Sequence, residues 1–313
     1  MDSYDVVVIG AGNAALCSAL AALERGARVL VIEKAPKHLR GGNSYFTGGG
    51  FRFPYEGISD IRRVIPEMTD EEASFVEIGA YPQSEMYDGI MRLTESLSDP
   101  DLIQILVNQA FPTVRWMKQQ GIDWVLMYGR QSYKVHGKHH FYGGLIAESV
   151  GGGKGLVETL FDAVESKGAD ILYESKAVNL RSDEARRVVG VDVQTPKERM
   201  RLEASAVVLA CGGFEANPEM RARYLGPDWE LAKVRGTRFN TGDGLRMAMD
   251  LGAQAVGHWS SCHAVAWDLN APPFGDRNVA DLFQKHSYPL GIVVNVHGNR
   301  FLDEGADYRN YTY

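Results

Sequence analysis

The first thirty-odd residues carry the clearest hydrophobic pattern of the chain. Residues 5–9 form a short run of mostly β-branched side chains, which is typical of a strand buried on both faces. Leucines three and four positions apart predict a helix over residues 16–25. Residues 28–32 repeat the buried-strand pattern and lead into Glu33. The pattern therefore predicts strand, turn, helix and strand in succession.

Further along the chain, hydrophobic periodicity predicts a mixture of helices and strands. Amphipathic helices are expected over residues 85–97, from 99 to Pro112 (which is expected to kink or end it), over 156–167 and over 245–251. Strands are expected over residues 171–173, 176–180, 206–210 and 291–295, and an antiparallel pair over 187–194 and 199–202. Most of residues 52–140 is expected to form helices and loops. The pattern is that of an α/β fold with a mostly parallel sheet, helices and an antiparallel excursion.

Composition places the chain among ordinary globular proteins. Its 313 residues are 45% hydrophobic and 23% charged, and this length predicts two domains. The net charge of −7 includes no block of like charges, so nucleic acid is not expected as a partner. No apolar run approaches about 18 residues and the first strand begins almost at once, so a cytoplasmic location is expected.

Neither the cysteines nor the histidines predict a metal site. Three cysteines, Cys17, Cys211 and Cys262, are scattered without metal-ligand spacing and form a poor disulfide framework. Cys17, on the first predicted helix, and Cys211, at the end of a predicted strand, are interpreted as small buried hydrophobic residues. Residues 134–140 hold three histidines, His136, His139 and His140, but no cysteine or acid stands at ligand spacing. This segment is interpreted as a solvated loop near a ligand.

Candidate chemistry begins at the turn between the first strand and the first helix. The turn reads Gly10-Ala11-Gly12-Asn13-Ala14-Ala15, a G-x-G-x-x-A pattern. Gly10 permits the tight turn, Gly12 lets the backbone approach a pyrophosphate, and Ala15 keeps helix and strand close. Glu33, 23 residues after Gly10, has the position of an acid that hydrogen-bonds an adenosine ribose. The sequence predicts a dinucleotide site, the alternative being a tight βα turn that binds nothing.

Glycine-rich loops extend this candidate site. Residues 41–50 contain five glycines, which permit close backbone approach to a cofactor, and Ser44 and Thr47 offer hydroxyl groups. Residues 151–155 superficially resemble a phosphate loop but do not satisfy G-x-x-x-x-G-K-[ST], so ATP binding is rejected. Asp243, in Thr241-Gly242-Asp243-Gly244, is either a ligand-binding acid or merely the N-cap of the next helix. No second strand-linked G-x-G-x-x-G appears, which argues against a separate NAD(P)H domain.

With these motifs in view, the chain resembles the flavoprotein family of fumarate reductase and succinate dehydrogenase, most closely its tricarballylate dehydrogenase branch. The resemblance runs through essentially all of the chain. The motifs that carry it are DVVVIGAGNAA at 5–15, VLVIEKA at 29–35, GGNS at 41–44, TGGG at 47–50, SDPDLIQILV at 98–107, GGGKGLVETL at 151–160, AVVLACGGFEANPE at 206–219, TGDG at 241–244 and GNRFLDEGADYRNYTY at 298–313. The last of these resembles the family's catalytic-domain signature.

The resemblance implies the domain organisation and a bound FAD. A Rossmann-like FAD-binding domain over residues 1–257, with a helical insert at about 55–140, would precede the start of an α+β catalytic or cap domain over 258–313. The pyrophosphate would lie on the glycine turn, the adenosine ribose on Glu33, the isoalloxazine near residues 42–49, and the adenine at the backbone of Val178. The implied FAD-binding residues are Gly10, Gly12, Asn13, Ala14, Ala15, Glu33, Lys34, Gly41, Gly42, Asn43, Ser44, Thr47, Gly48, Gly49, Val178, Ala210, Cys211, Gly212, Gly213, Thr241 and Asp243.

The resemblance also implies how the flavin is held and what it acts on. Asn43 stands where covalent members tether the flavin to a histidine, so non-covalent FAD is expected. The substrate would be a di- or tricarboxylate such as tricarballylate, oxidised by hydride transfer to flavin N5. His263 has the place of a substrate-binding histidine without its usual context, and Arg309 that of the arginine that moves the neighbouring proton. Read from the residue alone, Arg309 is a carboxylate clamp. Arg300 is expected to be structural and to pair with Glu304.

Several alternatives remain open at this level. The same chemistry suits fumarate, another unsaturated acid or a ketosteroid. The family's chains run on past the position of Tyr313, so this chain is expected to be an amino-terminal portion, and an inactive flavin-binding fragment is the rival hypothesis. A membrane-associated redox partner is what the branch implies for reoxidation.

Overall fold

The computed structural model describes residues 3–285 and 291–304 and is built around one six-stranded sheet. Four neighbouring strands of this sheet are parallel, and the other two, at one edge of the sheet, form an antiparallel extension. In order across the sheet the strands are β10 (Lys176–Ser182), β11 (Val188–Gln194), β12 (Arg199–Leu209), β1 (Tyr4–Ile9), β2 (Val29–Ile32) and β9 (Asp170–Leu172). The predicted α/β class with an antiparallel excursion is confirmed.

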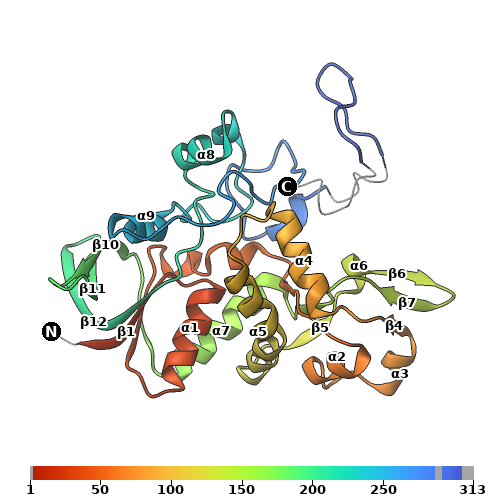
Figure 1. Cartoon of the computed structure of the whole chain (residues 1–313), viewed down its shortest axis with the longest axis horizontal. Coiled ribbons are helices and arrows are strands. Elements are labelled where there is room, and N and C mark those ends of the chain that lie inside the picture. Colours follow the sequence, from red (N-terminus) through yellow and green to blue (C-terminus); the bar gives the residue numbers. More distant parts are fainter. Residues whose placement is uncertain (1–2, 286–290, 305–313) are drawn as a thin grey trace.

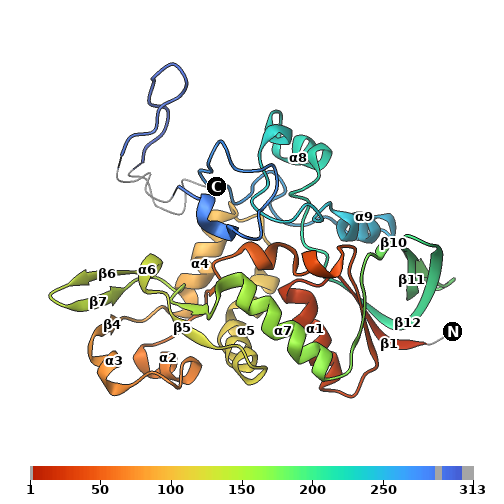
Figure 2. The same cartoon turned by 180° about the vertical axis from the view of Figure 1, so that it is seen from behind.

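Helices α1 (Asn13–Leu23) and α7 (Gly152–Ser166) pack side by side against one face of the parallel strands (Figures 1 and 2). Their apolar residues, such as Leu16 and Leu160, are fully buried in one cluster with Val8 and Val31 of the sheet. The opposite face of β1 and β2 packs against the antiparallel strands and α9 (Asp243–Asp250) in a second cluster. Strands β1 and β2 are therefore packed on both faces, by helices on one and by α9 and the antiparallel strands on the other.

Strand β12 is one continuous strand, where two separate strands were expected over 199–202 and 206–210. Its first half pairs antiparallel with β11, as Glu203 does with Gly190. Its second half pairs parallel with β1, and Ala204 faces Tyr4 at the start of that pairing. The polar residues between the two runs lie at the position where the strand changes partners, so they interrupt the hydrophobic pattern without interrupting the strand.

A mainly helical insert follows the glycine-rich loop. Its helices are α2 (Ile58–Val64), α3 (Asp70–Ser74), α4 (Gln83–Leu93), α5 (Pro100–Gln119) and α6 (Tyr128–Gln131). Pro112 was expected to kink or end its helix; it does not end it, because α5 runs through Pro112 as far as Gln119. Proline removes one backbone donor, but Val107, Val114 and Met117 bury one continuous face of α5 on both sides of it. Packing therefore maintains the helix.

Two small sheets complete the insert, and the histidine segment belongs to one of them. One sheet contains β3 (Gly50–Phe51), β8 (Ala147–Ser149) and β5 (Trp124–Leu126), and the other β4 (Val76–Ile78), β7 (Lys138–Phe141) and β6 (Ser132–Val135). The interpretation of residues 134–140 as a loop is wrong, since β6 and β7 form a hairpin with Tyr133 opposite His140. Figure 1 shows this hairpin projecting at the end of the molecule opposite α9.

Beyond β12 the described chain has few regular elements. They are the short helices α8 (Pro218–Leu225), η3 (Trp229–Leu231), α9 and η4 (Ala280–Phe283). Two further short helices, η1 (Lys37–Leu39) and η2 (Gly42–Phe46), lie between β2 and the insert. The strand expected over 291–295 is not formed, because only Val294 makes an isolated bridge, to Arg300. Arg300 pairs with Glu304 as expected. Within the described residues, no helix is long and apolar enough to cross a membrane.

Candidate functional site

A cavity lies at the carboxyl ends of β1 and β2, where the glycine turn and Glu33 were predicted to bind a dinucleotide. Such an edge is where open α/β sheets bind ligands. Its walls come from β1, β2, the start of β10, the residues after β12 and the start of α9. The lining residues are Ile9, Gly10, Ile32, Glu33, Lys34, Ser175, Lys176, Ala177, Cys211, Phe239, Thr241, Asp243 and Met247.

The glycine turn has the geometry that the sequence predicted. Gly10 has a φ of +111°, and a Cβ atom there would lie 2.2 Å from the carbonyl oxygen of Ala210. Helix α1 begins at Asn13 and has no side-chain N-cap, because Gly12 precedes it. A Cβ atom on Gly12 would lie 3.3 Å from Ser44 Oγ. The same oxygen accepts a hydrogen bond from the Asn13 N–H at 3.0 Å. The N–H groups in the first turn of α1 and the glycine backbone of the turn, which carries no side chains, suit a pyrophosphate.

Glu33 follows directly after β2 and is buried. Burial raises the pKa of its carboxyl group, although hydrogen bonds from backbone N–H groups, with that of Ala35 first, partly oppose the rise. The Ala35 N–H donates to Glu33 Oε1 at 2.7 Å and holds the carboxylate in one orientation. A fixed acceptor at this cavity is what a ribose hydroxyl requires.

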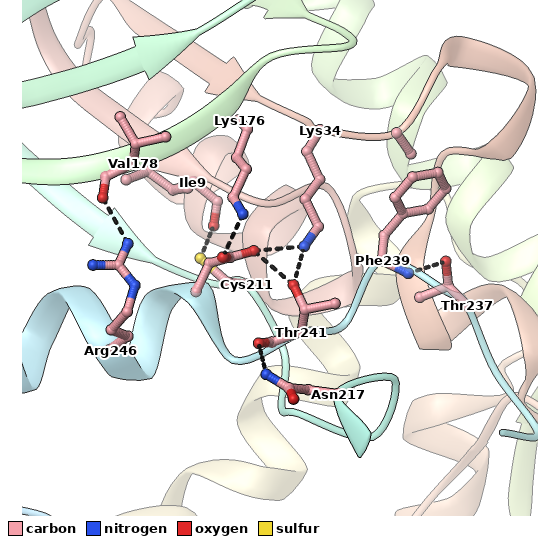
Figure 3. Close-up of polar contacts among 12 residues, drawn as sticks. Ile9, Lys34, Lys176, Val178, Cys211, Asn217, Thr237, Phe239, Thr241 and Arg246 are labelled. Atoms are coloured by element: carbon pink, nitrogen blue, oxygen red, sulfur yellow. Dashed lines mark hydrogen bonds and ion pairs between the residues drawn. The ribbon is translucent and has the colours of Figure 1, made fainter. Parts of the chain in front are cut away.

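Asp243 is the centre of a polar network in the cavity, and Figure 3 labels its partners Lys34, Lys176 and Thr241. Its carboxylate lies 2.6 Å from Lys34 Nζ and 2.9 Å from Lys176 Nζ, and it accepts a 2.8 Å hydrogen bond from the Thr241 hydroxyl. Burial alone would raise the pKa of Asp243, but the donors Lys34, Lys176 and Thr241 outweigh it and lower the pKa to about 2. The N-cap of α9 is Gly242 and no side chain caps it, so Asp243 is not merely an N-cap.

The glycine-rich loop lies against α7 and the segment around residue 237. A Cβ atom on Gly153 would lie 2.2 Å from the Ser44 carbonyl oxygen, which explains the second glycine cluster as a packing requirement of α7. The Thr47 hydroxyl donates to that same carbonyl and accepts from the Gly49 N–H. Asn43 Oδ1 accepts a hydrogen bond of 2.9 Å from the Thr237 N–H. The loop is therefore a fixed platform.

Residues after β12 close the cavity near the glycine turn. The Cys211 thiol donates a 3.4 Å hydrogen bond to the Ile9 carbonyl, and burial raises its pKa to about 11. Gly212 has a φ of +70° and packs against Asn240. The Val178 carbonyl, expected to lie at an adenine, accepts a 2.7 Å hydrogen bond from Arg246 (Figure 3). All three free cysteines are partly buried, and the described residues contain no cluster of three potential metal ligands.

Predicted cofactor residues from distant segments meet around this cavity, among them Gly10, Glu33, Lys34, Cys211, Thr241 and Asp243. The described residues do not test the predicted catalytic pair. His263 lies exposed in the irregular segment after α9. Arg309 lies outside the described residues. Sequence reasoning missed Lys176 and Arg246, which contact Asp243 and Val178. No motif marks either residue, because each acts through a contact between distant segments.

Known proteins resemble this chain over its whole length. It is 28% identical over 319 residues to a vinyl phenol reductase of Lactiplantibacillus plantarum, a match that covers 100% of this chain and 58% of the relative. It is 28% identical to a probable fumarate reductase of Shewanella frigidimarina, covering 97% of this chain and 47% of the relative. The chain thus spans about half the length of the curated relatives it matches.

Solved structures and a family model agree with this similarity. The open conformation of a flavocytochrome c3 fumarate reductase matches with a TM-score of 0.72 and 25% identity, covering 99% of this chain and 50% of that one. A 3-ketosteroid-Δ4-(5α)-dehydrogenase from Rhodococcus jostii RHA1 shares the fold, with a TM-score of 0.70 and 21% identity, covering 99% and 62%. The family model described as an FAD binding domain matches residues 5–312. The chain belongs to this family of FAD-binding domains.

Proposed function

We propose that the chain is the FAD-binding part of an oxidoreductase that acts on a carbon–carbon single or double bond. The cavity at the ends of β1 and β2 carries this proposal, because its glycine cradle and its fixed acid match the two ends of an adenosine diphosphate group. Relatives named for the reduction of vinyl phenol and fumarate, and a fold shared with a ketosteroid dehydrogenase, support the reaction type.

In this proposal each wall of the cavity has a task. The first-turn N–H groups of α1 hold the pyrophosphate, and Glu33 accepts a hydrogen bond from the ribose. The loop of residues 41–49 supports the isoalloxazine, while residues 210–213 and Thr241 to Asp243 line the remainder. The bound FAD supplies a two-electron acceptor or donor that no side chain can provide.

We further propose that FAD is bound without a covalent link. Asn43 occupies the loop position at which a histidine would be needed for a covalent bond to the flavin. Its carboxamide oxygen accepts a hydrogen bond from the Thr237 backbone N–H. A carboxamide has no nucleophilic nitrogen at neutral pH, unlike an imidazole. After acid precipitation, flavin absorbance should appear in the supernatant; flavin that stays with the precipitated protein would contradict this part of the proposal.

The substrate is a further part of the proposal. Fumarate or another unsaturated acid, a vinyl phenol and a ketosteroid fit the reaction type that the relatives support, and tricarballylate is the polycarboxylate favoured by the sequence motifs. His263 and Arg309 are proposed to act at the substrate. A membrane-associated redox carrier is proposed to reoxidise or reduce the flavin.

The visible spectrum of the purified chain with added FAD tests this function. Flavin bands that shift on binding and bleach anaerobically with one saturated substrate, or reappear from the reduced state with one unsaturated substrate, would support both cofactor and reaction type. Bound FAD that responds to none of these compounds would favour a flavin-binding portion without activity of its own. A chain that does not bind FAD would overturn the proposal.

A further inference from the structure

The hairpin of β6 and β7 carries a local positive charge that the chain as a whole does not have. Residues 124–147 contain no Asp or Glu, although the chain has 40 of these residues and a net charge of −7. Lys134 and Lys138 lie on the two paired strands, His136 lies in the turn between them, and His139 and His140 follow on β7. These residues are separated by others in the sequence, and strand pairing brings them together at one tip.

The charge of this tip is largely unopposed within the described part of the chain. Lys134, His136 and Lys138 are exposed, and neither lysine forms an ion pair with a described residue. On the other side of β7, Glu77 of β4 lies 3.5 Å from His140 Nδ1. Charges more than about 10 Å apart are largely screened at an ionic strength of 0.1 M, so the acids elsewhere in the chain do not cancel this local charge.

Exposed apolar side chains lie on the same small sheet. Tyr133 is 56% exposed, Tyr142 44% and Val135 39%, and Phe75, just before β4, is 53% exposed. The Tyr133 ring is stacked on the rings of His140 and Tyr142, with ring centres 5.4 and 6.3 Å apart. Residues two apart on a strand share a face, so Tyr133 and Val135 lie on one face of the hairpin. The hairpin therefore combines cations with an exposed apolar face.

The hairpin ends in a tight turn that holds these side chains in place. His136 has a φ of +47° and Gly137 a φ of +84°, the two positive values of a two-residue type I′ turn. Val135 and Lys138 pair directly on either side of it. Figures 1 and 2 show the tip projecting from the end of the molecule opposite β10, β11 and β12. Because the tip is already ordered, binding to a surface costs little conformational entropy.

We propose that the tip of the β6–β7 hairpin docks the chain onto an anionic lipid bilayer. Lys134 and Lys138 contact the lipid phosphates, and the rings of Tyr133 and Tyr142 enter the interfacial layer. Tyrosine is enriched at this depth of a bilayer, since its ring is apolar and its hydroxyl group is polar. Lysine extends its apolar stem along such a surface while its ammonium group reaches the charged headgroups.

The proposed contact is with lipid itself, so it is separate from the redox carrier proposed above. It is also independent of the FAD cavity, because no residue of the hairpin lines that cavity. The inference and the proposed function can therefore fail separately.

Two features favour a bilayer over other anionic partners. Single-stranded nucleic acids stack their bases on free aromatic faces, whereas the ring of Tyr133 is already stacked on His140 and Tyr142. A specific protein interface buries about 800 Å² on each partner, which a flat or hollowed surface provides better than a projecting tip. A fluid bilayer adapts to a convex tip, so it is the partner that this shape and charge fit.

Co-sedimentation of the purified chain with protein-free vesicles tests the inference. At low salt the chain should sediment with vesicles of equal parts phosphatidylglycerol and phosphatidylcholine and stay in the supernatant with phosphatidylcholine alone. Lys134→Gln and Lys138→Gln should each lower the partition coefficient about fivefold, the contribution of one basic residue near an anionic surface. Tyr133→Ser should also weaken binding several-fold, but it should leave the salt dependence unchanged because it removes no charge.

Lys197→Gln is the matched control, because it removes an exposed lysine from the turn between β11 and β12 at the other end of the molecule. Its vesicle binding should equal that of the wild type. Thermal unfolding of Lys134→Gln and Lys138→Gln should also match the wild type, which separates a lost contact from a lost fold.

A wild-type chain that stays in the supernatant with the anionic vesicles would overturn the inference. Vesicle binding that is unchanged when both lysines are replaced would overturn it as well. Retention of the chain by a single-stranded oligonucleotide, without binding to the vesicles, would identify a nucleic acid as the partner of this tip instead.

Discussion

The Lys34 ammonium lies 2.6 Å from a carboxylate oxygen of Asp243, although 209 residues separate the two in the chain. Lys34 follows the last residue of the predicted βαβ unit, Glu33, and Asp243 is the first residue of α9. The pair therefore joins the start of the fold to the segment that precedes the irregular region. Both side chains are mostly buried, so their interaction is screened less than a surface ion pair.

Neutralising Asp243 should destabilise the protein in a pH-dependent way. The folded-state pKa of Asp243, about 2, lies below its ordinary value of 3.8, so the carboxylate stabilises the fold above about pH 4, and this stabilisation is lost as the pH falls toward 2. Asp243→Asn should lower the free energy of unfolding by about 2 kcal/mol at pH 7 and by much less at pH 2.5. Urea unfolding of the flavin-free protein at both pH values measures this difference.

The matched control for this prediction is Asp183→Asn, which removes a carboxylate paired with Arg187 in the β10–β11 hairpin. Exposed pairs of this kind contribute little to stability, so its effect at pH 7 should be clearly smaller. An Asp243→Asn protein as stable as the wild type at pH 7 would show that the network does not stabilise the fold.

Replacing Gly10 should abolish FAD binding, whereas a similar change at Gly26 should not. In Gly10→Ala the added methyl group would lie 2.2 Å from the Ala210 carbonyl oxygen, and the φ of +111° is unfavourable for alanine. Gly26 also has a positive φ, +77°, but its Cβ position has no neighbour within 4 Å. Gly26→Ala should cost about 1 kcal/mol of stability from backbone strain and leave the FAD affinity unchanged.

Thermal unfolding and FAD titration of both variants check this pair. Gly10→Ala should lose more stability, by about 1–3 kcal/mol beyond the backbone strain, because the overlap forces β1 and β12 apart. Normal FAD affinity in Gly10→Ala would show that the turn is not the pyrophosphate site.

Cys211 should be a slow thiol that FAD protects. Burial raises its pKa to about 11 and that of Cys17 to about 12, so few thiolates form at pH 8 and both should react slowly with a thiol reagent. The rate at Cys211 should rise about tenfold per pH unit between pH 8 and 10, since its reactive form is the thiolate. Saturating FAD should suppress the reaction at Cys211, which lines the cavity, and leave Cys262 unaffected.

Peptide mass spectrometry after timed labelling distinguishes the three thiols, and Cys211→Ala identifies the protected signal. Equal labelling of Cys211 with and without FAD, in a chain whose spectrum shows bound flavin, would place the cofactor away from this cavity.

The sequence predicted the elements whose signal is local. The first βαβ unit, the glycine turn and the acid after β2 follow from hydrophobic runs and from the steric freedom of glycine, and all of them are present in the structure. The α/β class follows from the same runs. These features depend on residues near one another in the chain, so periodicity and spacing are sufficient to find them.

Features that depend on tertiary contacts were missed or wrongly predicted. Helix α5 continues through Pro112 because buried residues on both sides maintain it, and the histidine segment is a hairpin because β4 pairs with β7. Lys176 and Arg246 were missed because their partners lie 67 and 68 residues away in the chain. The roles of His263 and Arg309 remain predictions.

Arg277 should anchor the segment after α9 to the glycine-rich loop. Its guanidinium lies 3.3 Å from the centre of the Tyr45 ring and donates a 2.9 Å hydrogen bond to the Arg40 carbonyl. Both contacts are partly or fully buried, so Arg277→Met should lower the free energy of unfolding by about 1–2 kcal/mol. The larger effect should be local: limited proteolysis should cut within residues 258–285 several times faster, because local opening of that segment becomes easier.

Arg63→Met is the control for this anchor, since Arg63 also lies over an aromatic ring, that of Phe111 at 5.0 Å, but its side chain is half exposed. Its proteolysis pattern should match that of the wild type. FAD should slow the cleavage of the wild type within 258–285, because a cofactor on the loop that contains Tyr45 stabilises the conformation that Arg277 contacts. Unchanged cleavage in Arg277→Met would mean that the backbone hydrogen bond between Gly275 and Gly236, at 2.8 Å, holds this segment without the arginine.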